Sequence, residues 1–461
     1  MTEAVGRVLE AIRENQRIAI FGDYDCDGVL GAHILRSVLS SFGGQARACL
    51  PHRDDGYGLN PRAVHQFSLA GTDLLITVDN GINAREAVLL AQRLGIDVLV
   101  IDHHRIQVQA NTLTVWSPEF CGAGLAALFA WALAQRAGWV EKRTERLLSA
   151  VGQYAAIASI ADCVPLLHGS RTLARLGMDE LGRTEHCGAK ELLRASCADP
   201  SRPDSNDLAF GIAPRINAAG RIDHPALALA VFEAARNEGA ARKSVEVLNR
   251  LNQERRQLVA AQIEELCSEI PKSVPAGLVV YRESCPKGIA GLVAAKCVER
   301  FSAPSIVLAP SPDPGLVVGS GRSVAGFDLV EGLEQFRGLF TRFGGHAQPV
   351  GLTMLLANVE TFAKEFAALV ATFKLKKSEM RVDAELVLAT VGRQFDEQLA
   401  LLEPFGEGNP APVFLLRRAE VVSIRNRWVR IRQGRYSLEA LCWDLVLKEG
   451  MRGDIAASGA L

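Results

Sequence analysis

The sequence has almost no net charge and no CxxC motif, and each of these features excludes some classes of protein. The formal net charge of the 461 residues is −1 at pH 7. Because overall charge gives no attraction to a polyanion, any nucleic-acid binding must come from local basic patches and from metals. The ten cysteines include no CxxC pair, which favours reduced thiols in a cytosol over a disulfide framework.

Long apolar runs, internal repeats and low-complexity tracts are also missing. The longest apolar stretch, AGLAALFAWALA, is too short to span a bilayer. The first residues, MTEAVGRVLEAIRENQ, have the pattern of an amphipathic helix with acidic residues and not of a signal peptide. With 48% hydrophobic and 22% charged residues, the chain has material for about three globular domains. We therefore expect a cytoplasmic protein that does not bind a membrane.

The sequence does contain three apolar segments that each end in acidic or imidazole side chains. RIAIF precedes GDYDCDG, DLLITV precedes DNG, and DVLVI precedes DHH. Each segment has the composition of a buried parallel strand, and a helical pattern follows it. Because ligands gather at the carboxyl ends of parallel strands, seven side chains are expected to meet in one pocket. They are Asp23, Asp25, Asp27, Asp79, Asp102, His103 and His104.

A pocket of this composition predicts divalent cations. Crowded carboxylates and imidazoles are costly to bury unless cations neutralise them. Oxygen and nitrogen ligands without cysteine suit Mn²⁺ or Mg²⁺ better than structural zinc. Asp79 is our candidate for a carboxylate that bridges two ions, and such a centre suits attack on phosphorus by metal-activated water. Aspartates also cap helices and shape turns, and for Asp23 that alternative stays open.

These motifs resemble those of the DHH phosphoesterase superfamily in order and spacing. ASIAD (158–162) is similar to its fourth motif and PRINAAGRID (214–223) to its fifth. SGRS (320–323) and GGHAQPVG (344–351) resemble the phosphate-contacting motifs of the DHH-associated domain. LEPFGEGNPAPVF (402–414) resembles the start of the nucleic-acid-binding domain of the RecJ family. The resemblance runs from about residue 16 to the end and implies a single-strand-specific 5′-to-3′ exonuclease.

The resemblance also implies roles for individual residues around two ions. One ion is expected on Asp27, Asp79, His103 and Asp162, and the other on Asp25 and Asp79. Phe21 stands where pyrophosphatase members have a further histidine, so one ion is expected to bind weakly until substrate phosphate joins it. Asp102 is expected to orient a histidine. His104 is expected to contact the scissile phosphate or protonate the leaving oxygen, with a histidine satisfied in the core as the alternative.

Four basic or glycine-rich segments are expected to grip the substrate through backbone N–H groups and guanidinium forks. SGRS is the candidate for a terminal 5′-phosphate, and a tyrosine of PHRDDGYGL could stack on a base, although a structural turn is equally consistent. The candidates are Arg215, Asn217 and Arg221 in PRINAAGR, Ser320 and Arg322 in SGRS, His346 in GGHAQPVG, and Arg53 and Tyr57 in PHRDDGYGL.

A further basic segment lies between 417 and 436, where seven arginines occur with one glutamate. Alternation along RNRWVRIRQGR predicts two arginines on one strand face and two on the other. Arginines interleaved with an aromatic suit the backbone and bases of single strands. The alternative is a charged edge strand protected from aggregation. The candidate DNA track is Arg425, Arg427, Trp428, Arg430 and Arg432.

The organisation along the chain predicts an α/β protein. We expect a DHH-type doubly wound parallel sheet (1–224), a long connecting helix (225–270), a smaller DHH-associated α/β domain (271–372) and, after a linker, an OB-like β domain (379–461). From Ala240 to Ile270 the helix would reach roughly 45 Å, enough to join two lobes, although it could also pack flat on one domain. The RecJ pattern would continue with another strand beyond GDIAASGAL, so an incomplete or differently closed barrel is expected.

The resulting hypothesis is a metal-dependent exonuclease that removes 5′-mononucleotides from single-stranded DNA in DNA repair and recombination. A single-strand-binding protein and a helicase are the expected partners. One alternative is a phosphodiesterase for short oligonucleotides or cyclic dinucleotides. Another is a non-catalytic replication scaffold, but such proteins typically lose ligands that are all present here. The sequence has no G-x-S-x-G elbow that would indicate a covalent intermediate.

Overall fold

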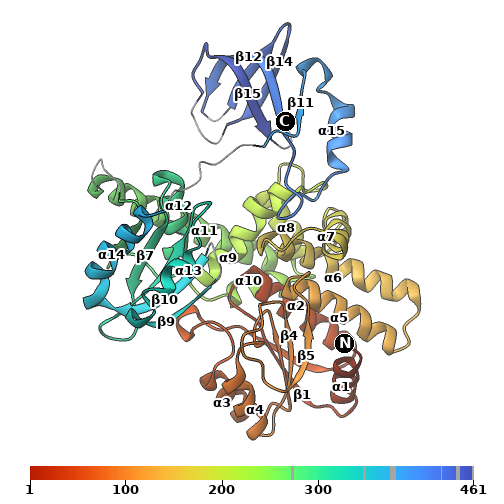
Figure 1. Cartoon of the computed structure of the whole chain (residues 1–461). Helices are drawn as coiled ribbons and strands as arrows, with labels where there is room; N and C mark the ends of the chain where they lie inside the picture. The colour runs from red at the N-terminus through yellow and green to blue at the C-terminus, as the bar shows by residue number, and fades with distance from the viewer. Residues whose placement is uncertain (271–274, 346–348, 374–380, 427, 443–446, 459–461) are drawn as a thin grey trace.

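The computed structural model describes residues 1–461 except 271–274, 346–348, 374–380, 427, 443–446 and 459–461. Three sheets form the centres of three bodies, and Figure 1 shows the C-terminal body standing above the other two. Most of the linker expected at 373–380 lies outside the described residues. None of the described helices combines the length and the apolarity needed to cross a membrane.

The first body contains a five-stranded parallel sheet in the order β2-β1-β3-β4-β5, which confirms the doubly wound fold. Its strands are β1 (Arg17–Phe21), β2 (Gln45–Cys49), β3 (Leu74–Val78), β4 (Asp97–Asp102) and β5 (Leu113–Trp116). One face is covered by α1 (Thr2–Arg13), α2 (Cys26–Ser41) and α5 (Gly122–Arg136), and the other by α3 (Pro61–Leu69) and α4 (Arg85–Arg93). Burial on both faces explains why the three central strands are almost wholly apolar.

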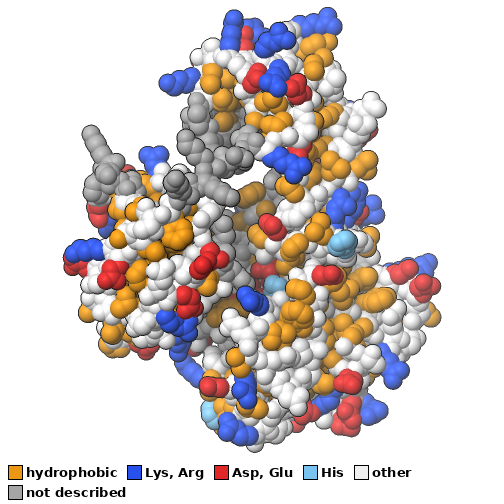
Figure 2. Space-filling view, in the orientation of Figure 1, with side chains coloured by type: hydrophobic (Ala, Val, Ile, Leu, Met, Phe, Trp, Pro, Cys, Tyr) orange, Lys and Arg blue, Asp and Glu red, His pale blue; other side chains and the backbone are white. Residues whose placement is uncertain are grey.

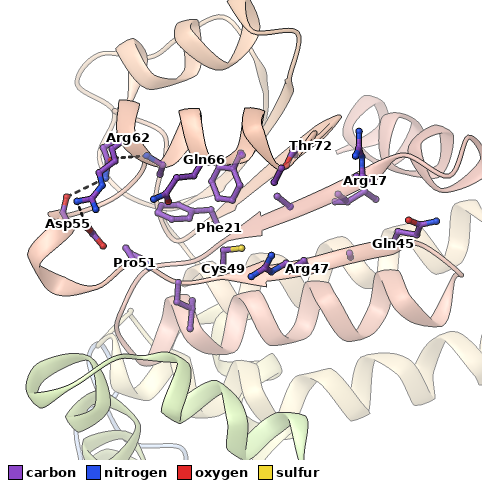
Figure 3. A pocket seen from close by; sticks show the side chains of 18 of the residues that line it. Arg17, Phe21, Gln45, Arg47, Cys49, Pro51, Asp55, Arg62, Gln66 and Thr72 are labelled. Carbon is purple, nitrogen blue, oxygen red and sulfur yellow. Dashed lines mark hydrogen bonds and ion pairs between the residues drawn. The ribbon is translucent and has the colours of Figure 1, made fainter.

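A groove of about 730 Å³ remains on the second face, beside α3 and over β1 and β2. In Figure 3, Phe21 and Cys49 lie on its floor, and Gln66 lies on the wall that α3 provides. None of the carboxylates expected to bind metal is among its described lining residues. This groove is therefore separate from the predicted site.

A helical layer extends the first body and carries the fourth and fifth motifs. It consists of α6 (Glu141–Ala161), α7 (His168–Leu181), α8 (Cys187–Ser196), a π-helical turn (Asp207–Ile212) and α9 (Ala213–Ile222). Asp162 ends α6, and PRINAAGR lies within α9. Both segments lie beside α2, so the helical layer brings these motifs back to the ends of the strands.

The helix expected over 225–270 is interrupted, which corrects that prediction. It consists of α10 (Ala226–Glu233) and α11 (Glu238–Glu269). The break occurs because the Asn237 side chain accepts a hydrogen bond from the Ala240 N–H at 3.0 Å and starts a new helix. The 32 residues of α11 give a length of about 48 Å. It packs on α8 and α9 in the first body and on α12 in the second, so it does connect the two.

The second body has a mixed sheet in the order β6-β7-β8-β10-β9, parallel only between β6 and β7. Its strands are β6 (Leu278–Tyr281), β7 (Ser305–Pro310), β8 (Leu316–Arg322), β9 (Phe340–Gly345) and β10 (Pro349–Leu355). Its helices are α12 (Ala290–Phe301), α13 (Leu329–Glu334) and α14 (Val359–Ala371). SGRS lies at the end of β8, and β9 was not expected from the sequence.

The third body is a curled β half-barrel, as expected of an OB-like domain. Its elements are β11 (Ala384–Glu385), α15 (Arg393–Ala400), β12 (Val413–Arg425), β13 (Trp428–Gln433), β14 (Tyr436–Leu441) and β15 (Arg452–Ser458). The long β12 pairs with β15 along its first half and with β13 along its second half. The GDIAASGAL segment itself provides β15, so the described residues already contain five strands. Short 3₁₀ turns occur at Arg53–Asp55, Arg337–Leu339, Leu356–Asn358 and Leu388–Thr390.

Candidate active site

The first acidic motif follows β1 and starts α2. The Asp25 side chain caps α2 by accepting a hydrogen bond from the Gly28 N–H at 3.1 Å. Asp27 is buried in the first turn, and its two oxygens accept hydrogen bonds from the N–H groups of Gly122 at 2.6 Å and Ala123 at 2.8 Å. Because these N–H groups begin α5, Asp27 is held by the positive end of a second helix.

Asp79 follows β3 in a left-handed conformation, with φ of 62°. Few non-glycine residues adopt this backbone, and such residues concentrate at functional sites. The Asp79 N–H donates to the Ile101 carbonyl at 3.0 Å, which ties it to β4. A Cβ on Gly122 would come within 2.6 Å of the Asp79 Cβ. Only glycine therefore allows α5 to approach this carboxylate.

His103 lies at the centre of the carboxylates. Its Nε2 is 3.1 Å from Asp79 Oδ1, 3.5 Å from Asp162 Oδ2 and 3.8 Å from Asp27 Oδ2. Three overlapping groups each have one ligand atom per residue within 4.8 Å of the others. They are Asp27, His103 and Asp162; Asp23, Asp25 and Asp79; and Asp79, Asp102, His103 and His104. The structure thus brings all the strand-end residues together, and it places Asp23 among them.

Asp102 uses its oxygens to hold the two histidines. Its Oδ1 accepts hydrogen bonds from the N–H groups of His103 and His104, and it lies 2.8 Å from His104 Nδ1. Its Oδ2 accepts one from the Ile82 N–H at 2.9 Å. The Tyr57 hydroxyl lies 3.0 Å from His104 Nε2. Asp102 therefore orients the His104 imidazole through Nδ1, and the Tyr57 hydroxyl contacts Nε2 of the same ring.

The pKa shifts of His104 and Asp102 follow from the same contacts. Burial lowers the pKa of His104, but its hydrogen bond to Asp102 and the charges of Asp102, Asp25 and Asp27 together outweigh burial and leave the pKa above its ordinary value. Burial acts in the opposite direction on Asp102, and its bonds to His104 and to the Ile82 N–H leave its pKa below the ordinary value. His104 therefore tends to keep a proton beside an ionised Asp102.

The other carboxylates repel one another. Burial, followed by the neighbouring Asp27 and Asp25, raises the pKa of Asp79 well above its usual range and that of Asp162 to about 9. Burial also lowers the pKa of His103, so this imidazole supplies little positive charge. Carboxylate oxygens and imidazole nitrogen with unbalanced negative charge fit divalent cations such as Mn²⁺ or Mg²⁺.

Arg221 brings positive charge to the edge of the pocket, where the second body meets the first. Its Nη1 donates to the Gly288 carbonyl at 3.0 Å. Burial, with the guanidinium groups of Arg53 and Arg255, lowers its pKa to about 10, and the Asp25 carboxylate acts in the opposite direction. A group of neighbouring guanidinium side chains suits a phosphate.

Arg53 extends this positive charge along the loop that carries Tyr57. Its Nε donates to the Gly220 carbonyl at 2.8 Å, and its guanidinium lies 3.9 Å from the centre of the Tyr24 ring. Lys287 of the second body donates to the Arg53 carbonyl at 3.0 Å and pairs with Asp54. Sequence reasoning missed Lys287 and Arg255 because neither lies in a recognisable motif.

The SGRS segment also lies near Arg221, at the junction of the first two bodies. Arg322 Nη1 donates to Ser320 Oγ at 2.8 Å, and burial lowers the pKa of the guanidinium. A Cβ on Gly291 would lie 3.0 Å from both side chains, so they pack closely on α12. The expected phosphate contact His346 lies outside the described residues.

Arg215 and Asn217 have internal partners in place of free donors. The three nitrogens of Arg215 donate to the Ala195 carbonyl, the Gly211 carbonyl and Asn249 Oδ1, each at 2.7 Å. Asn217 Oδ1 accepts a hydrogen bond from the Cys26 N–H at 2.8 Å, which holds the start of α2. The geometry does not support the expected substrate contact for Arg215, and it gives Asn217 a role in positioning the first motif.

Among the described residues of the β12–β13 hairpin, Arg425 lies on the same face as Arg430 and Arg432, which corrects the prediction that they lie on opposite faces. The chain turns at Asn426, where φ is 58°, so Arg425 pairs across the hairpin with Trp428. Along β13, Val429 and Ile431 are buried and the alternate residues are exposed. Arg425, Trp428, Arg430 and Arg432 therefore share one face. Arg427 lies outside the described residues.

Most of this positive charge is balanced. Arg430 pairs with Glu439 at 2.6 Å, and Arg432 pairs with Glu420 at 2.7 Å. Within the part of the chain that the structure describes, Arg425 makes no ion pair; it lines a hollow of about 260 Å³ together with Trp428. Figure 2 shows acidic side chains among the basic ones on this body.

Comparisons with known proteins agree on one family. The DHH family, N-terminal domain, matches residues 17–159, and the RecJ OB domain matches 382–447. Single-stranded-DNA-specific exonuclease RecJ of Dickeya dadantii (strain 3937) is 34% identical over 90% of this chain and 77% of its own length. The crystal structure of RecJ from Thermus thermophilus in complex with Mn²⁺ has a TM-score of 0.85 at 29% identity, covering 100% of this chain and 68% of that one. The same protein in complex with Mg²⁺ has a TM-score of 0.76 at 28% identity, covering 100% and 66%.

Proposed function

This chain belongs to the RecJ family of single-stranded-DNA-specific exonucleases, and from that premise we propose that it removes nucleotides from the 5′ end and releases 5′-mononucleotides. It is a hydrolase of phosphodiester bonds in single-stranded DNA. The observation that carries the proposal is the convergence of Asp27, Asp79 and Asp162 on His103, within 3.8 Å, beside the half-buried Arg221.

We assign two cations, Mn²⁺ or Mg²⁺, to the carboxylate cluster. Asp79 belongs to the group with Asp23 and Asp25, and its Oδ1 lies 3.1 Å from His103 Nε2 of the other group, so it is the proposed bridge. Asp27, His103 and Asp162, with the adjacent Asp79, would hold one ion, and Asp23, Asp25 and Asp79 would hold the other. Bound cations would neutralise the scissile phosphate and lower the pKa of the attacking water. The relative crystallised with Mn²⁺ and with Mg²⁺ supports this choice of metals.

We assign the leaving 3′ oxygen to His104. Asp102 Oδ1 accepts a hydrogen bond from the Nδ1–H of His104, so the Nε2–H remains to donate a proton to the leaving group. The raised pKa of His104 favours the protonated form that a general acid needs. Tyr57, 3.0 Å from Nε2, holds the ring in place until the substrate arrives.

The guanidinium groups at the junction of the two bodies are assigned to the substrate phosphates. Arg221 and Arg53 flank the carboxylate pocket, and Arg322 with Ser320 offers donors for the terminal 5′-phosphate. Planar guanidinium forks match phosphate oxygens well. DNA repair and recombination, with a single-strand-binding protein and a helicase as partners, is the setting that we infer from the family.

The decisive test is a Mn²⁺-dependent digestion of matched single and double strands, labelled at either end. The proposal predicts immediate release of a 5′ label as a mononucleotide and progressive shortening of a 3′-labelled single strand. Duplex should remain intact. Loss of a 3′ label first would contradict the direction. Cleavage confined to very short oligonucleotides would favour the small-substrate alternative, and no cleavage at all would favour a scaffold.

A further inference from the structure

The segment 401–409 (LLEPFGEGN), which lies between α15 and β12, contacts the first body and is called the clasp segment below. In the sequence, this segment stands out only because it resembles the start of the nucleic-acid-binding domain of the RecJ family. Figure 1 shows it reaching from the C-terminal body down to α7 and α8. Its contacts there are with protein groups close to the metal pocket.

Two arginines of α7 hold the first part of the clasp segment. Arg171 Nη2 donates to the carbonyls of Leu402 at 2.9 Å and Glu403 at 3.2 Å. Arg175 Nη1 donates to the carbonyls of Leu401 at 2.9 Å and Glu403 at 3.1 Å. Four hydrogen bonds from charged donors fix this backbone on α7.

The Glu403 side chain makes a second attachment. Its carboxylate accepts hydrogen bonds from the Ser205 hydroxyl and from the Phe405 N–H at 3.0 Å. Ser205 is buried and stands just before the π-helical turn that leads into α9. The clasp segment is therefore also attached to the segment that leads, through the π-helical turn, into α9.

Two glycines let the clasp segment lie directly on the loop after α6. The Leu166 N–H donates to the Glu407 carbonyl at 2.7 Å. A Cβ on Gly406 would come within 2.8 Å of Leu166 Cδ1, and one on Gly408 would lie 3.2 Å from Leu167 Cγ. The Gly-Glu-Gly sequence is explained by this close approach, with Gly408 also in a left-handed conformation at φ of 75°.

The loop under the clasp segment begins with a residue of the metal pocket. Asp162 ends α6 only four positions before Leu166. Between them Val164 is buried, and its N–H donates a hydrogen bond to the Ser159 carbonyl at 3.3 Å. The loop is therefore held at its middle as well as at its ends. The position of Leu166 is therefore coupled to that of Asp162, whose Oδ2 lies 3.5 Å from His103 Nε2.

We propose that the clasp segment positions Asp162 in the metal pocket, so that the C-terminal body contributes to cation binding. This inference rests on the proposed function for the identity of the cations. Residues 401–409 are positioning residues, because they act through the loop after α6. A clasp segment that served only to anchor the third body would leave the cation affinity unchanged.

The test replaces Gly406 by alanine, with Gly392→Ala as the matched control because a Cβ there meets nothing within 4 Å. Mn²⁺ affinity is measured by calorimetry and by the spin-resonance signal of the free ion. Cleavage of a 5′-phosphorylated dinucleotide is followed against Mn²⁺ concentration. We expect Gly406→Ala to weaken one Mn²⁺ site by about 10-fold, with the turnover rate restored by excess Mn²⁺. Wild-type Mn²⁺ affinity with weaker binding of long DNA would overturn the proposal.

Arg175→Gln is the second variant, so the test does not depend on the folding of Gly406→Ala. It removes two clasp contacts from a half-buried helix position. Its control is Arg146→Gln, because Arg146 is exposed on α6 and makes no ion pair or hydrogen bond with the described residues. Because calorimetry needs no catalysis, a protein that binds Mn²⁺ but cuts no DNA refutes the proposed function alone. Mn²⁺ binding unchanged in both Gly406→Ala and Arg175→Gln refutes this inference alone.

Discussion

The metal pocket and the arginine face of β13 are both dense in charge, but they differ in what each charge faces. In the pocket, Asp27 and Asp79 are buried beside each other, and His103 gives them little positive charge. On β13, Arg430 and Arg432 each have a glutamate within 2.7 Å. A charge whose counter-charge comes from the protein needs no ligand. A buried charge without one indicates where a ligand must bind.

The junction between the first two bodies also has charge that the protein does not balance, but there the charge is positive. Arg221 has Arg53 and Arg255 as its charged neighbours, with Asp25 as the opposing group. Unbalanced positive charge beside unbalanced negative charge suits a substrate phosphate held next to cations. Part of the β13 face, in contrast, is already neutralised, so we expect it to contribute less to binding.

Replacing Asp79 by alanine should have the largest effect, because this carboxylate belongs to one proposed ligand group and lies 3.1 Å from His103 of the other. We expect nuclease activity to fall by at least about 10²-fold, the scale of losing one preorganised electrostatic contact. The measurement is the rate of mononucleotide release with saturating Mn²⁺. Asp199→Ala, at an exposed loop position, should behave as wild type. Equal activity in both variants would indicate a contaminating nuclease or a scaffold.

Removing divalent cations should destabilise the first body, since repulsion among the carboxylates is then unrelieved. Mn²⁺ at 100 times its dissociation constant should stabilise the wild type by about 2.7 kcal/mol. The measurement is thermal unfolding in EDTA and in Mn²⁺. In Asp79→Asn, with one negative charge removed, the difference between the two conditions should shrink. An undiminished difference in this variant would place the cations elsewhere.

Arg322→Ala should weaken the preference for a 5′-phosphate over a 5′-hydroxyl. Loss of a hydrogen bond to a charged group costs about 1.5–3 kcal/mol, or roughly 10-fold or more in preference. The measurement is the ratio of kcat/KM for the two substrates. Arg337→Ala removes an exposed arginine that pairs with Glu334, and it should leave the ratio unchanged. If Arg322→Ala also leaves it unchanged, SGRS does not bind the terminal phosphate.

His33 extends the comparison to a buried imidazole whose pKa is shifted by burial and by other basic side chains, His186 and Arg36. Burial and the neighbouring His186 lower its pKa to about 3, from an ordinary value of 6.5. Between these values the unfolded chain binds the extra proton, so stability is lost as the pH falls from 6.5 towards 3. His33→Phe should flatten this loss by about 1.4 kcal/mol per pH unit. Denaturant unfolding from pH 7 to pH 4 measures it, and parallel curves for the two proteins would contradict the assignment.

The smallest effect is expected from freeing one of the balanced arginines. Glu439→Gln leaves Arg430 without its partner, so single-stranded DNA should bind a few-fold more tightly and with a steeper salt dependence. One additional phosphate contact changes the slope of log affinity against log salt by about 0.7. Fluorescence anisotropy at several salt concentrations measures both quantities. An unchanged slope would mean that DNA does not contact this face.

The motifs at the strand ends allowed most of the metal pocket to be predicted from the sequence. Parallel strands place their carboxyl ends at one edge of a sheet, so the position of Asp79 beside His103 follows from topology. Asp162 needed the family resemblance, because a helix end far along the chain has no such rule. The metal-ligand role of Asp23 stayed open in the sequence because a capping aspartate and a ligand look alike there.

Other features depend on contacts between distant segments and could not be predicted. The partners of Arg215 and Arg430 come from other elements, so the charges along the chain could not show that both side chains have partners within the protein. Lys287 and Arg255 join the site only because the second body and α11 fold against the first. The contact of Leu166 with Glu407 likewise joins segments that no local pattern relates.

The central claim is that two divalent cations occupy the pocket formed by the three strand ends. Anomalous diffraction from crystals grown with Mn²⁺ tests it most directly. We predict two peaks about 3.5–4 Å apart, with Asp79 between them and His103 and Asp162 beside one of them. Mn²⁺ bound elsewhere in an active enzyme, with no peak among these side chains, would contradict the account.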